Sequence, residues 1–332
     1  MKQAAALVVS APAKVNLGLR IHGRRADGYH LLESLFVPLD LADRLRVELE
    51  TLPADAAGRV TLAVSRERAA DVPVNDSNLA AQAAEAFLGA AGRPDLRVVL
   101  ELEKSIPAQA GLGGGSSDAG AVLRALAALL PGAVRPEVLA ALALRLGADV
   151  PFFLDPRPAL VRGIGEQIEP VPGLRPLVLL LVHPGIGLAT AAVYAAFDAL
   201  AGALTPQGPG PTVRPPERPL EPEALARLLE NDLEPAALRL CPLLLRLRQQ
   251  IAGAGAVAVG MSGSGPTLFG VFPDEAAAGK AALRMGEEAG RADGPRRGPA
   301  IWTRVARTVS ASKPLLPVPS SRGPRDGASP NW

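Results

Sequence analysis

The stretch Pro107-Ala-Gln-Ala-Gly-Leu-Gly-Gly-Gly-Ser-Ser-Asp-Ala119 indicates both the fold and the kind of ligand. Its glycines leave the backbone free to adopt positive φ and to approach a ligand closely. Apolar residues alternate over 96–103, which predicts a half-buried strand before it. After it, Ser116, Ser117 and Asp118 are favourable N-cap residues for a helix over 119–130. A glycine loop that leads into a helix N-terminus predicts an anion site, because unpaired N–H groups and the helix dipole favour phosphate there.

The glycine loop matches neither of two common nucleotide-binding motifs. A Walker A loop needs a lysine directly after its glycines, and none follows here. The dinucleotide fingerprint Gly-x-Gly-x-x-Gly fits Gly111 and Gly113, but Ser116 stands at the last glycine position. A flexible linker is the remaining alternative, and the position between a patterned strand and a strong helix argues against it.

The composition excludes several classes of protein. A length of 332 residues allows roughly one to three domains with a sizeable core. A net charge of +2 and an aromatic content of 3% argue against a nucleic-acid partner. The single cysteine, Cys241, excludes a disulfide scaffold and indicates a reducing compartment, so we expect a cytoplasmic protein. We expect no membrane partner, because no apolar run reaches the about 18 residues that a span needs.

Two charged residues stand in apolar surroundings. Lys14 shares one face of a predicted strand with Asn16, and a lysine there is uncommon unless it meets an anion. A solvated lysine at a strand edge is also compatible with the pattern. Asp149 follows a helix end among apolar residues, where a carboxylate is costly unless it is hydrogen-bonded, paired or used. A structural aspartate turn is its alternative.

Tyr29 and His30 are adjacent and follow an Asp27-Gly28 turn. An aromatic ring beside a hydrogen-bonding group can bind a planar base by stacking and polar contacts. A core tyrosine beside a surface histidine explains the same two residues equally well.

The chain after residue 170 predicts a second, α+β half over 171–311, separate from an N-terminal domain over 1–170. Within it, the glycine turn Ser262–Gly265 either brings its backbone close to another group or closes a simple hairpin. The segment 202–219 is rich in Pro and Gly and predicts a mobile surface loop. For 312–332 the composition predicts a disordered tail.

A phosphate cradle, a separate lysine and an aspartate in apolar surroundings are the parts that phosphoryl transfer needs. The glycine stretch resembles the central motif of the GHMP kinase superfamily, which includes galactokinase, homoserine kinase and mevalonate kinase. The stretches 12–17, 25–30 and 147–151 are similar to those of the branch that phosphorylates an alcohol carrying a cytidine diphosphate group, in isoprenoid precursor synthesis. The turn 262–265 fits the C-terminal glycine motif.

This resemblance implies an α+β two-domain GHMP kinase fold, with a ribosomal-protein-S5-like N-terminal domain and a ferredoxin-like C-terminal domain. It implies ATP and Mg²⁺ as cofactors, a small-molecule substrate with a cytidine diphosphate group, and a monomer or weak homodimer.

The resemblance also assigns roles to residues. Asp149 is the general base, and the charge of Lys14 keeps it ionised. Asn16 positions the acceptor, Tyr29 stacks on the cytosine and His30 hydrogen-bonds its edge. Tyr194 closes the other face of the ring, and Thr190 joins the substrate site. The ATP site comprises Pro107, Ala108, Gln109, Ala110, Gly111, Leu112, Gly113, Gly114, Gly115, Ser116 and Ser117, with Asn78, Leu79 and Lys104 near the adenine and Ser116 or Ser117 on phosphate or Mg²⁺.

Gln109 and Ala110 depart from the family, in which many members carry glycine, so the first turn of the cradle is less permissive here. Two other functions remain open. Homoserine or mevalonate kinase activity would leave the Tyr29–His30 pair without a purpose, because those acceptors carry no base. A nucleotide-binding regulator would not need both Lys14 and Asp149.

Overall fold

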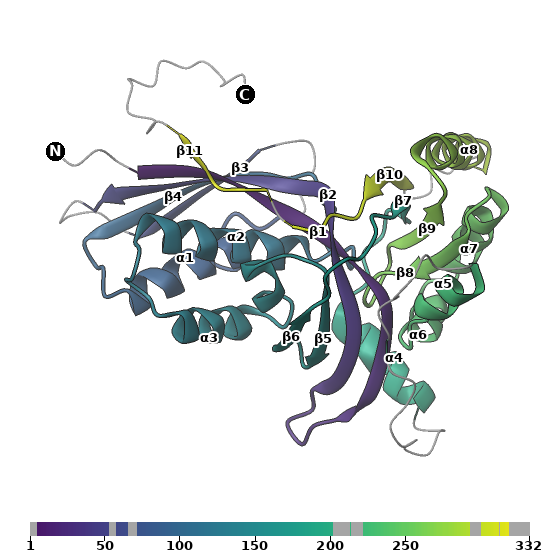
Figure 1. Ribbon diagram of the computed structural model, residues 1–332, viewed down its shortest axis with the longest axis horizontal. Helices are drawn as coiled ribbons and strands as arrows, with labels where there is room; N and C mark the ends of the chain where they lie inside the picture. The colour runs from purple at the N-terminus through teal and green to yellow at the C-terminus, as the bar shows by residue number, and fades with distance from the viewer. Residues whose placement is uncertain are drawn as a thin grey trace.

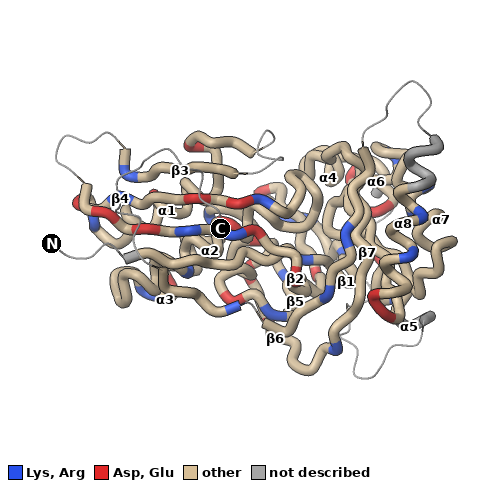
Figure 2. The backbone as a smooth tube through the Cα atoms, turned by 90° about the horizontal axis from the view of Figure 1, so that it is seen from above, with Lys and Arg blue, Asp and Glu red and all other residues tan. Residues whose placement is uncertain are grey.

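Two β-sheets, one in each half of the chain, organise the computed structural model (Figure 1). The structure describes residues 5–52, 58–65, 72–201, 213, 222–292, 300–311 and 313–318. Basic and acidic residues are interleaved over both halves (Figure 2). Among the described residues, no helix combines the length and apolar character needed to cross a membrane.

Two long antiparallel strands, β1 (Ala5–Arg24) and β2 (His30–Thr51), form the centre of the N-terminal sheet. The C-terminal part of β2, from Arg44 to Thr51, pairs with β4 (Leu96–Glu103), and β3 (Val60–Ser65) runs parallel to β4. The N-terminal part of β2, from Leu32 to Phe36, pairs with β5 (Ala159–Gly163), which pairs with β6 (Gln167–Pro170). The glycine loop contacts β1 near its middle, at Pro12 and Lys14, and the β1–β2 turn lies at one end of both strands.

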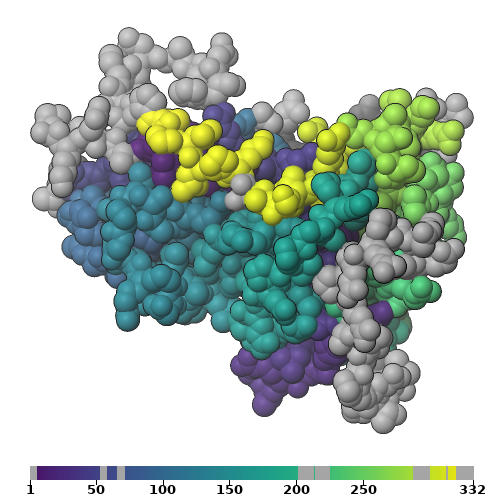
Figure 3. All heavy atoms as spheres, in the orientation of Figure 1, coloured from purple at the N-terminus to yellow at the C-terminus, as the bar shows by residue number. Residues whose placement is uncertain are grey.

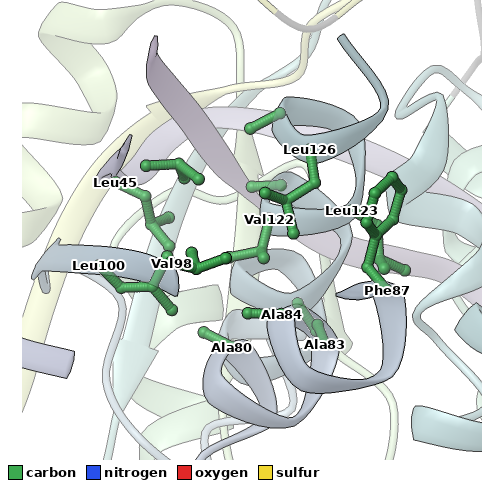
Figure 4. Packing of buried hydrophobic residues seen from close by; sticks show 14 of the residues in the cluster. Leu45, Ala80, Ala83, Ala84, Phe87, Val98, Leu100, Val122, Leu123 and Leu126 are labelled. Atoms are coloured by element: carbon green, nitrogen blue, oxygen red, sulfur yellow. The ribbon is translucent and has the colours of Figure 1, made fainter. Parts of the chain in front are cut away.

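Two helices, α1 (Leu79–Ala90) and α2 (Gly114–Leu129), cover one face of this sheet, and α3 (Pro136–Leu146) packs against them on the side away from the strands (Figure 1). Strand residues such as Val98 and Leu100 meet helix residues such as Ala84 and Val122 in a fully buried core (Figure 4). Burying a side chain of this size contributes about 1.5–3 kcal/mol. Apolar packing thus fixes the position of α2, and with it the glycine loop that precedes α2.

The helix after the glycine loop begins earlier than the sequence predicts. We expected it at residue 119 with the serines as caps, but α2 starts at Gly114, and Gly113 is its N-cap with φ of 70°. A glycine in this left-handed conformation turns the chain into the helix without a side-chain cap. Ser116 and Ser117 therefore lie inside the first turn of α2.

The C-terminal sheet consists of β7 (Val178–His183), β8 (Ala258–Met261), β9 (Leu268–Phe272) and β10 (Trp302–Arg307). Its order is β10-β7-β9-β8 with every described pair antiparallel, which is the ferredoxin-like arrangement.

Strand β7 is buried on both faces. Successive side chains point to opposite sides of a strand, so alternate residues of β7 meet different partners. Leu179 and Leu181 pack with β1 and β2 of the N-terminal half, whereas Leu180 and Val182 pack against helices. The inner face thus joins the two halves. The helices of this half are α4 (Thr190–Ala201), α5 (Pro222–Leu228), α6 (Glu234–Leu240), α7 (Leu243–Gly253) and α8 (Glu275–Ala292).

The predicted disordered tail over 312–332 is wrong in part. Leu316–Val318 forms β11, which pairs antiparallel with Ala6–Val8 at the outer edge of β1. Pro317 is tolerated because an edge strand leaves one row of backbone groups unpaired. The segment runs across the surface of the N-terminal half (Figure 3). Residues 319–332 and, apart from Val213, the predicted loop 202–219 lie outside the described residues.

Candidate active site

A cleft of about 510 Å³ lies where the glycine loop, β1 and α4 meet. It brings together residues that are far apart in the sequence, as predicted. The predicted site residues that line it are Lys14, Asn16, Asn78, Leu79, Lys104, Pro107, Ala108, Gln109, Ala110, Gly111, Gly113, Gly114, Gly115, Ser116, Asp149, Thr190 and Tyr194. Four predicted residues are not in its lining: Tyr29, His30, Leu112 and Ser117.

The glycine loop has the backbone geometry of a cradle. Gln109, Gly111 and Gly113 have φ of 49°, 73° and 70°, which only glycine adopts without strain. A Cβ on Gly111 would stand 2.3 Å from the carbonyl oxygen of Ser262, so a side chain is excluded at this position. The loop then enters α2, whose first N–H groups have no partner inside the helix. This end of the cleft can therefore accept an anion.

Two loop residues anchor the cradle to β1. Leu112 is buried, and its carbonyl oxygen accepts a 3.0 Å hydrogen bond from the Lys14 backbone N–H. The Ser117 hydroxyl donates to the carbonyl oxygen of Pro12 at 2.7 Å. Ser117 is therefore not placed for its predicted contact with phosphate or Mg²⁺, and of these two neighbouring serines Ser116 is the one that lines the cleft.

Lys14 and Asp149 meet in the cleft, as predicted. The Lys14 ammonium is 3.4 Å from Oδ2 of Asp149 and lies over the Phe36 ring, 4.5 Å from its centroid. The Lys14 side chain is 4% exposed and that of Asp149 is 32% exposed. The ammonium is thus enclosed, while the carboxylate reaches the open cleft, where an acceptor hydroxyl can approach it.

Both ends of the Asn16 amide are occupied by protein groups. Its Oδ1 accepts a 2.6 Å hydrogen bond from the Lys14 ammonium, and its Nδ2 donates to the Ser34 hydroxyl at 2.8 Å. The amide therefore holds Lys14 in place. A contact between Asn16 and the acceptor stays a prediction.

An aromatic group lies beside the cleft on α4. The His30 ring stacks on Tyr194 with centroids 4.8 Å apart, and its Nε2 is 2.7 Å from Oδ1 of Asp198. Burial and, less, the negative charge of Asp149 raise the pKa of Tyr194 to about 12, so its phenol is neutral. Tyr29 lies in the turn between β1 and β2 and is 58% exposed. The structure thus joins His30 to Tyr194 and leaves the Tyr29 ring open to solvent.

The second glycine turn, Ser262–Gly265, packs against the first. The Ser262 hydroxyl donates to the carbonyl oxygen of Gly111 at 2.8 Å, and the Ser264 and Thr190 hydroxyls are 3.0 Å apart. Gly263 and Ser264 line the cleft. The structure contains both alternatives for this turn: it closes the hairpin of β8 and β9, and its backbone lies close to Gly111. The sequence did not single out Ser264.

Comparison with known proteins decides the family. Residues 78–155 match the GHMP kinases N terminal domain, and residues 220–292 match the GHMP kinases C terminal domain. A 4-diphosphocytidyl-2-C-methyl-D-erythritol kinase of Anaeromyxobacter dehalogenans is 44% identical over 330 residues, covering 98% of this chain and 97% of that protein. The chain belongs to the 4-diphosphocytidyl-2-C-methyl-D-erythritol kinase family of GHMP kinases.

Other matches agree with this family. The kinase of the same name from Cereibacter sphaeroides is 42% identical and covers 82% of this chain and 91% of its own. A crystal structure of 4-(cytidine 5'-diphospho)-2C-methyl-D-erythritol kinase matches with a TM-score of 0.65 and 41% identity, covering 90% of this chain and 98% of the other. Homoserine kinase from Cytophaga hutchinsonii, at 19% identity over 96% of this chain and 98% of its own, shares the fold with a TM-score of 0.64. The predicted GHMP kinase fold and small-molecule kinase activity are confirmed.

The kinase contains a buried ion cluster that the sequence did not predict. The Lys104 ammonium contacts Oδ2 of Asp43 and lies 2.8 Å from Oδ2 of Asp118, with all three side chains at most 5% exposed. Oδ1 of Asp43 accepts from the backbone N–H groups of Ser105 and Ile106 at 2.5 and 2.9 Å. The cluster therefore ties the chain that enters the glycine loop to the start of α2.

The protonation of this cluster follows from its charges. Burial and the negative charge of Asp43 raise the pKa of Asp118 well above its usual range, although Lys104 opposes this shift. Burial alone would lower the pKa of Lys104, but the two carboxylates outweigh it, and the pKa is raised. Lys104 is therefore charged, and its ammonium is held by the two carboxylates at the border of the cleft.

Proposed function

We propose that this kinase transfers the γ-phosphoryl group of ATP to the 2-hydroxyl of 4-diphosphocytidyl-2-C-methyl-D-erythritol, in the non-mevalonate isoprenoid precursor pathway. The observation that carries the proposal is the Lys14–Asp149 pair in the cleft beside the glycine loop. The 44% identity to a protein named for this substrate supports the choice of acceptor.

In the proposed reaction, Asp149 accepts the proton of the acceptor hydroxyl as its oxygen bonds to the γ-phosphorus. The bond between that phosphorus and the bridging oxygen breaks, and ADP leaves. The enclosed Lys14 ammonium supplies positive charge at the reacting centre, where charge stabilisation and positioning provide most of the rate enhancement of phosphoryl transfer.

We propose that Mg²⁺ enters with ATP. It prefers near-octahedral oxygen ligands and commonly uses substrate phosphates with few protein groups. No cluster of three or more acidic, His or Cys side chains that could hold a metal occurs in the described ranges, which fits such a site. Ser116, part-buried at the first turn of α2, is the hydroxyl that fits Mg²⁺ or phosphate. The ion would neutralise charge on the phosphates.

For the cytosine we propose a site around Tyr29, His30 and Tyr194, with Thr190 nearby. The Tyr29 ring is open to solvent and can stack on a base, while Tyr194 supplies an aromatic wall. Asp198 engages Nε2 of His30, so we assign Nδ1 to the base.

The direct test measures ADP release with ATP, Mg²⁺ and each of three acceptors in parallel: the cytidyl-erythritol, homoserine and mevalonate. Turnover with the cytidyl substrate alone is the expected result. Turnover only with another acceptor would retain the Lys14–Asp149 chemistry and refute the base site. Tight ATP binding with no turnover of any acceptor would favour a nucleotide-binding regulator.

A further inference from the structure

A chain of buried hydrogen bonds runs from the backbone of β1 to the Lys14 ammonium. The Ser34 hydroxyl donates to the carbonyl oxygen of Gly18 at 2.6 Å and accepts from Nδ2 of Asn16 at 2.8 Å. Oδ1 of Asn16 accepts from Lys14 at 2.6 Å. Lys14, Asn16 and Ser34 are 3%, 2% and 0% exposed, so water does not compete for these bonds.

The carbonyl oxygen of Gly18 is available to Ser34 because the strand is irregular there. The register between β1 and β2 shifts between Leu17 and Leu19, which leaves Gly18 as the extra residue of a β-bulge. Gly18 has φ of 83°, and a Cβ there would stand 2.3 Å from the carbonyl oxygen of Leu228. The position therefore requires glycine, and its carbonyl has a fixed direction.

The bulge determines which way the Asn16 amide faces. A serine hydroxyl has one proton, and Gly18 takes it, so the oxygen of Ser34 can only accept from Asn16. A flipped amide would place Oδ1 against that proton-free side and Nδ2 against the Lys14 ammonium, donor against donor. Only one orientation satisfies every group, and in it Oδ1 faces Lys14.

We propose that Ser34 is a positioning residue for phosphoryl transfer, which acts through Asn16 to hold the Lys14 ammonium beside Asp149. The proposal rests on the proposed function, because it concerns Lys14 during that reaction. Ser34 does not line the cleft. Ser34 aligns the Lys14 ammonium, so it acts on the phosphoryl-transfer step rather than on substrate binding.

The test compares Ser34→Ala, Ser34→Thr and a matched control in steady-state assays of the full-length kinase. Ser34→Ala should lower kcat about tenfold, which corresponds to about 1.4 kcal/mol, and should change KM for ATP less than about twofold. Ser34→Thr retains a hydroxyl and should restore kcat to within about threefold of wild type.

Thr308→Val is the control, because Thr308 is also buried and its hydroxyl accepts from the Leu177 N–H at 2.8 Å, but away from the cleft. It should lower thermal stability without lowering kcat. An unchanged kcat in folded Ser34→Ala, or an equal loss of kcat in Thr308→Val, would overturn the proposal. If Ser34→Ala does not fold, Ser34→Cys takes its place, since a thiol is a weaker hydrogen-bonding group of similar size.

The proposed function is tested separately by wild-type turnover. If the acceptor is another alcohol, the same variants are compared with that alcohol, since the Lys14 chemistry is common to both. A crystal structure of Ser34→Ala, or of Ser34→Cys in its place, adds a readout without turnover. The Asn16 amide or the Lys14 ammonium should be displaced, and an unmoved pair would overturn the proposal whatever the acceptor.

Discussion

Replacing Lys104 by Met should be among the most destabilising single changes in the N-terminal half. The substitution removes an ammonium from between two carboxylates and keeps a flexible apolar stem. The side chains of Asp43 and Asp118 are 0% and 4% exposed, so solvent cannot replace the lost charge.

Without Lys104, the two carboxylates differ in the hydrogen-bond donors that they keep. Asp43 keeps two backbone N–H donors on Oδ1, whereas Oδ1 of Asp118 is buried without a partner already in the wild type. Above its folded-state pKa, Asp118 is then a buried charge without compensation. Breaking a buried ion pair in this way costs about 3–5 kcal/mol of the free energy of unfolding.

The loss of unfolding free energy in Lys104→Met should grow as the pH rises. The pKa of Asp118 is raised in the folded wild type, and the loss of the Lys104 charge raises it further. A carboxyl with a raised pKa in the folded state binds its proton more tightly there than in the unfolded chain, so stability falls as pH rises towards the folded-state pKa. Lys104→Met should therefore lose more stability at about pH 9 than at about pH 5, because the extra loss begins where Asp118 of the folded wild type gives up its proton.

The assay is urea unfolding of wild type and variant at both pH values. The unfolding free energies are compared where both proteins show the same m, the slope of the free energy against urea concentration. Adding Asp118→Asn to Lys104→Met should recover part of the loss at about pH 9, because the uncompensated charge is gone. A loss below about 1 kcal/mol at about pH 9, or a loss that is the same at both pH values, would refute the charge balance assigned to this cluster.

Three further changes test the cleft. Asp149→Asn should lower turnover by about 10²–10⁴ if the carboxylate is the general base, with ATP affinity nearly unchanged; ADP release and ATP titration measure the two, and near-wild-type turnover would remove Asp149 from the mechanism. Tyr29→Ala should weaken binding of the cytidyl substrate by about 1–3 kcal/mol, read from its KM, and an equal loss for ATP would show that the base site is elsewhere. Gly111→Ala should abolish ATP binding in a calorimetric titration, because its Cβ meets the Ser262 carbonyl at 2.3 Å; retained ATP affinity would contradict the role of this backbone contact.

The sequence predicted the parts of the site that depend on local motifs. Lys14 and Asp149 stood out because charged residues in apolar surroundings need a reason, and the structure places them 3.4 Å apart. The turn into α2 followed from the glycines and the helix that they precede, and the binding of phosphate there stays a prediction. Resemblance supplied the roles of these residues, which spacing alone did not.

The features that the sequence missed depend on contacts across the fold. Asp43 and Asp118 lie on different elements, and their shared ammonium becomes visible only when β2, β4 and α2 pack together. The start of α2 was placed too late because serine caps are a strong signal, and a left-handed Gly113 replaced them. β11 was missed because three residues in a Pro-rich segment are too short for a pattern, and their stability comes from β1.

The pairing of β11 with β1 has a consequence for the order of folding. The last described strand completes the edge of the first, so β1 leaves the ribosome with a row of backbone groups that stays unpaired until residues 316–318 are made. An open strand edge is a template for pairing with another chain. Nascent chains that stall before this point would therefore expose an open strand edge, which the segment 316–318 closes.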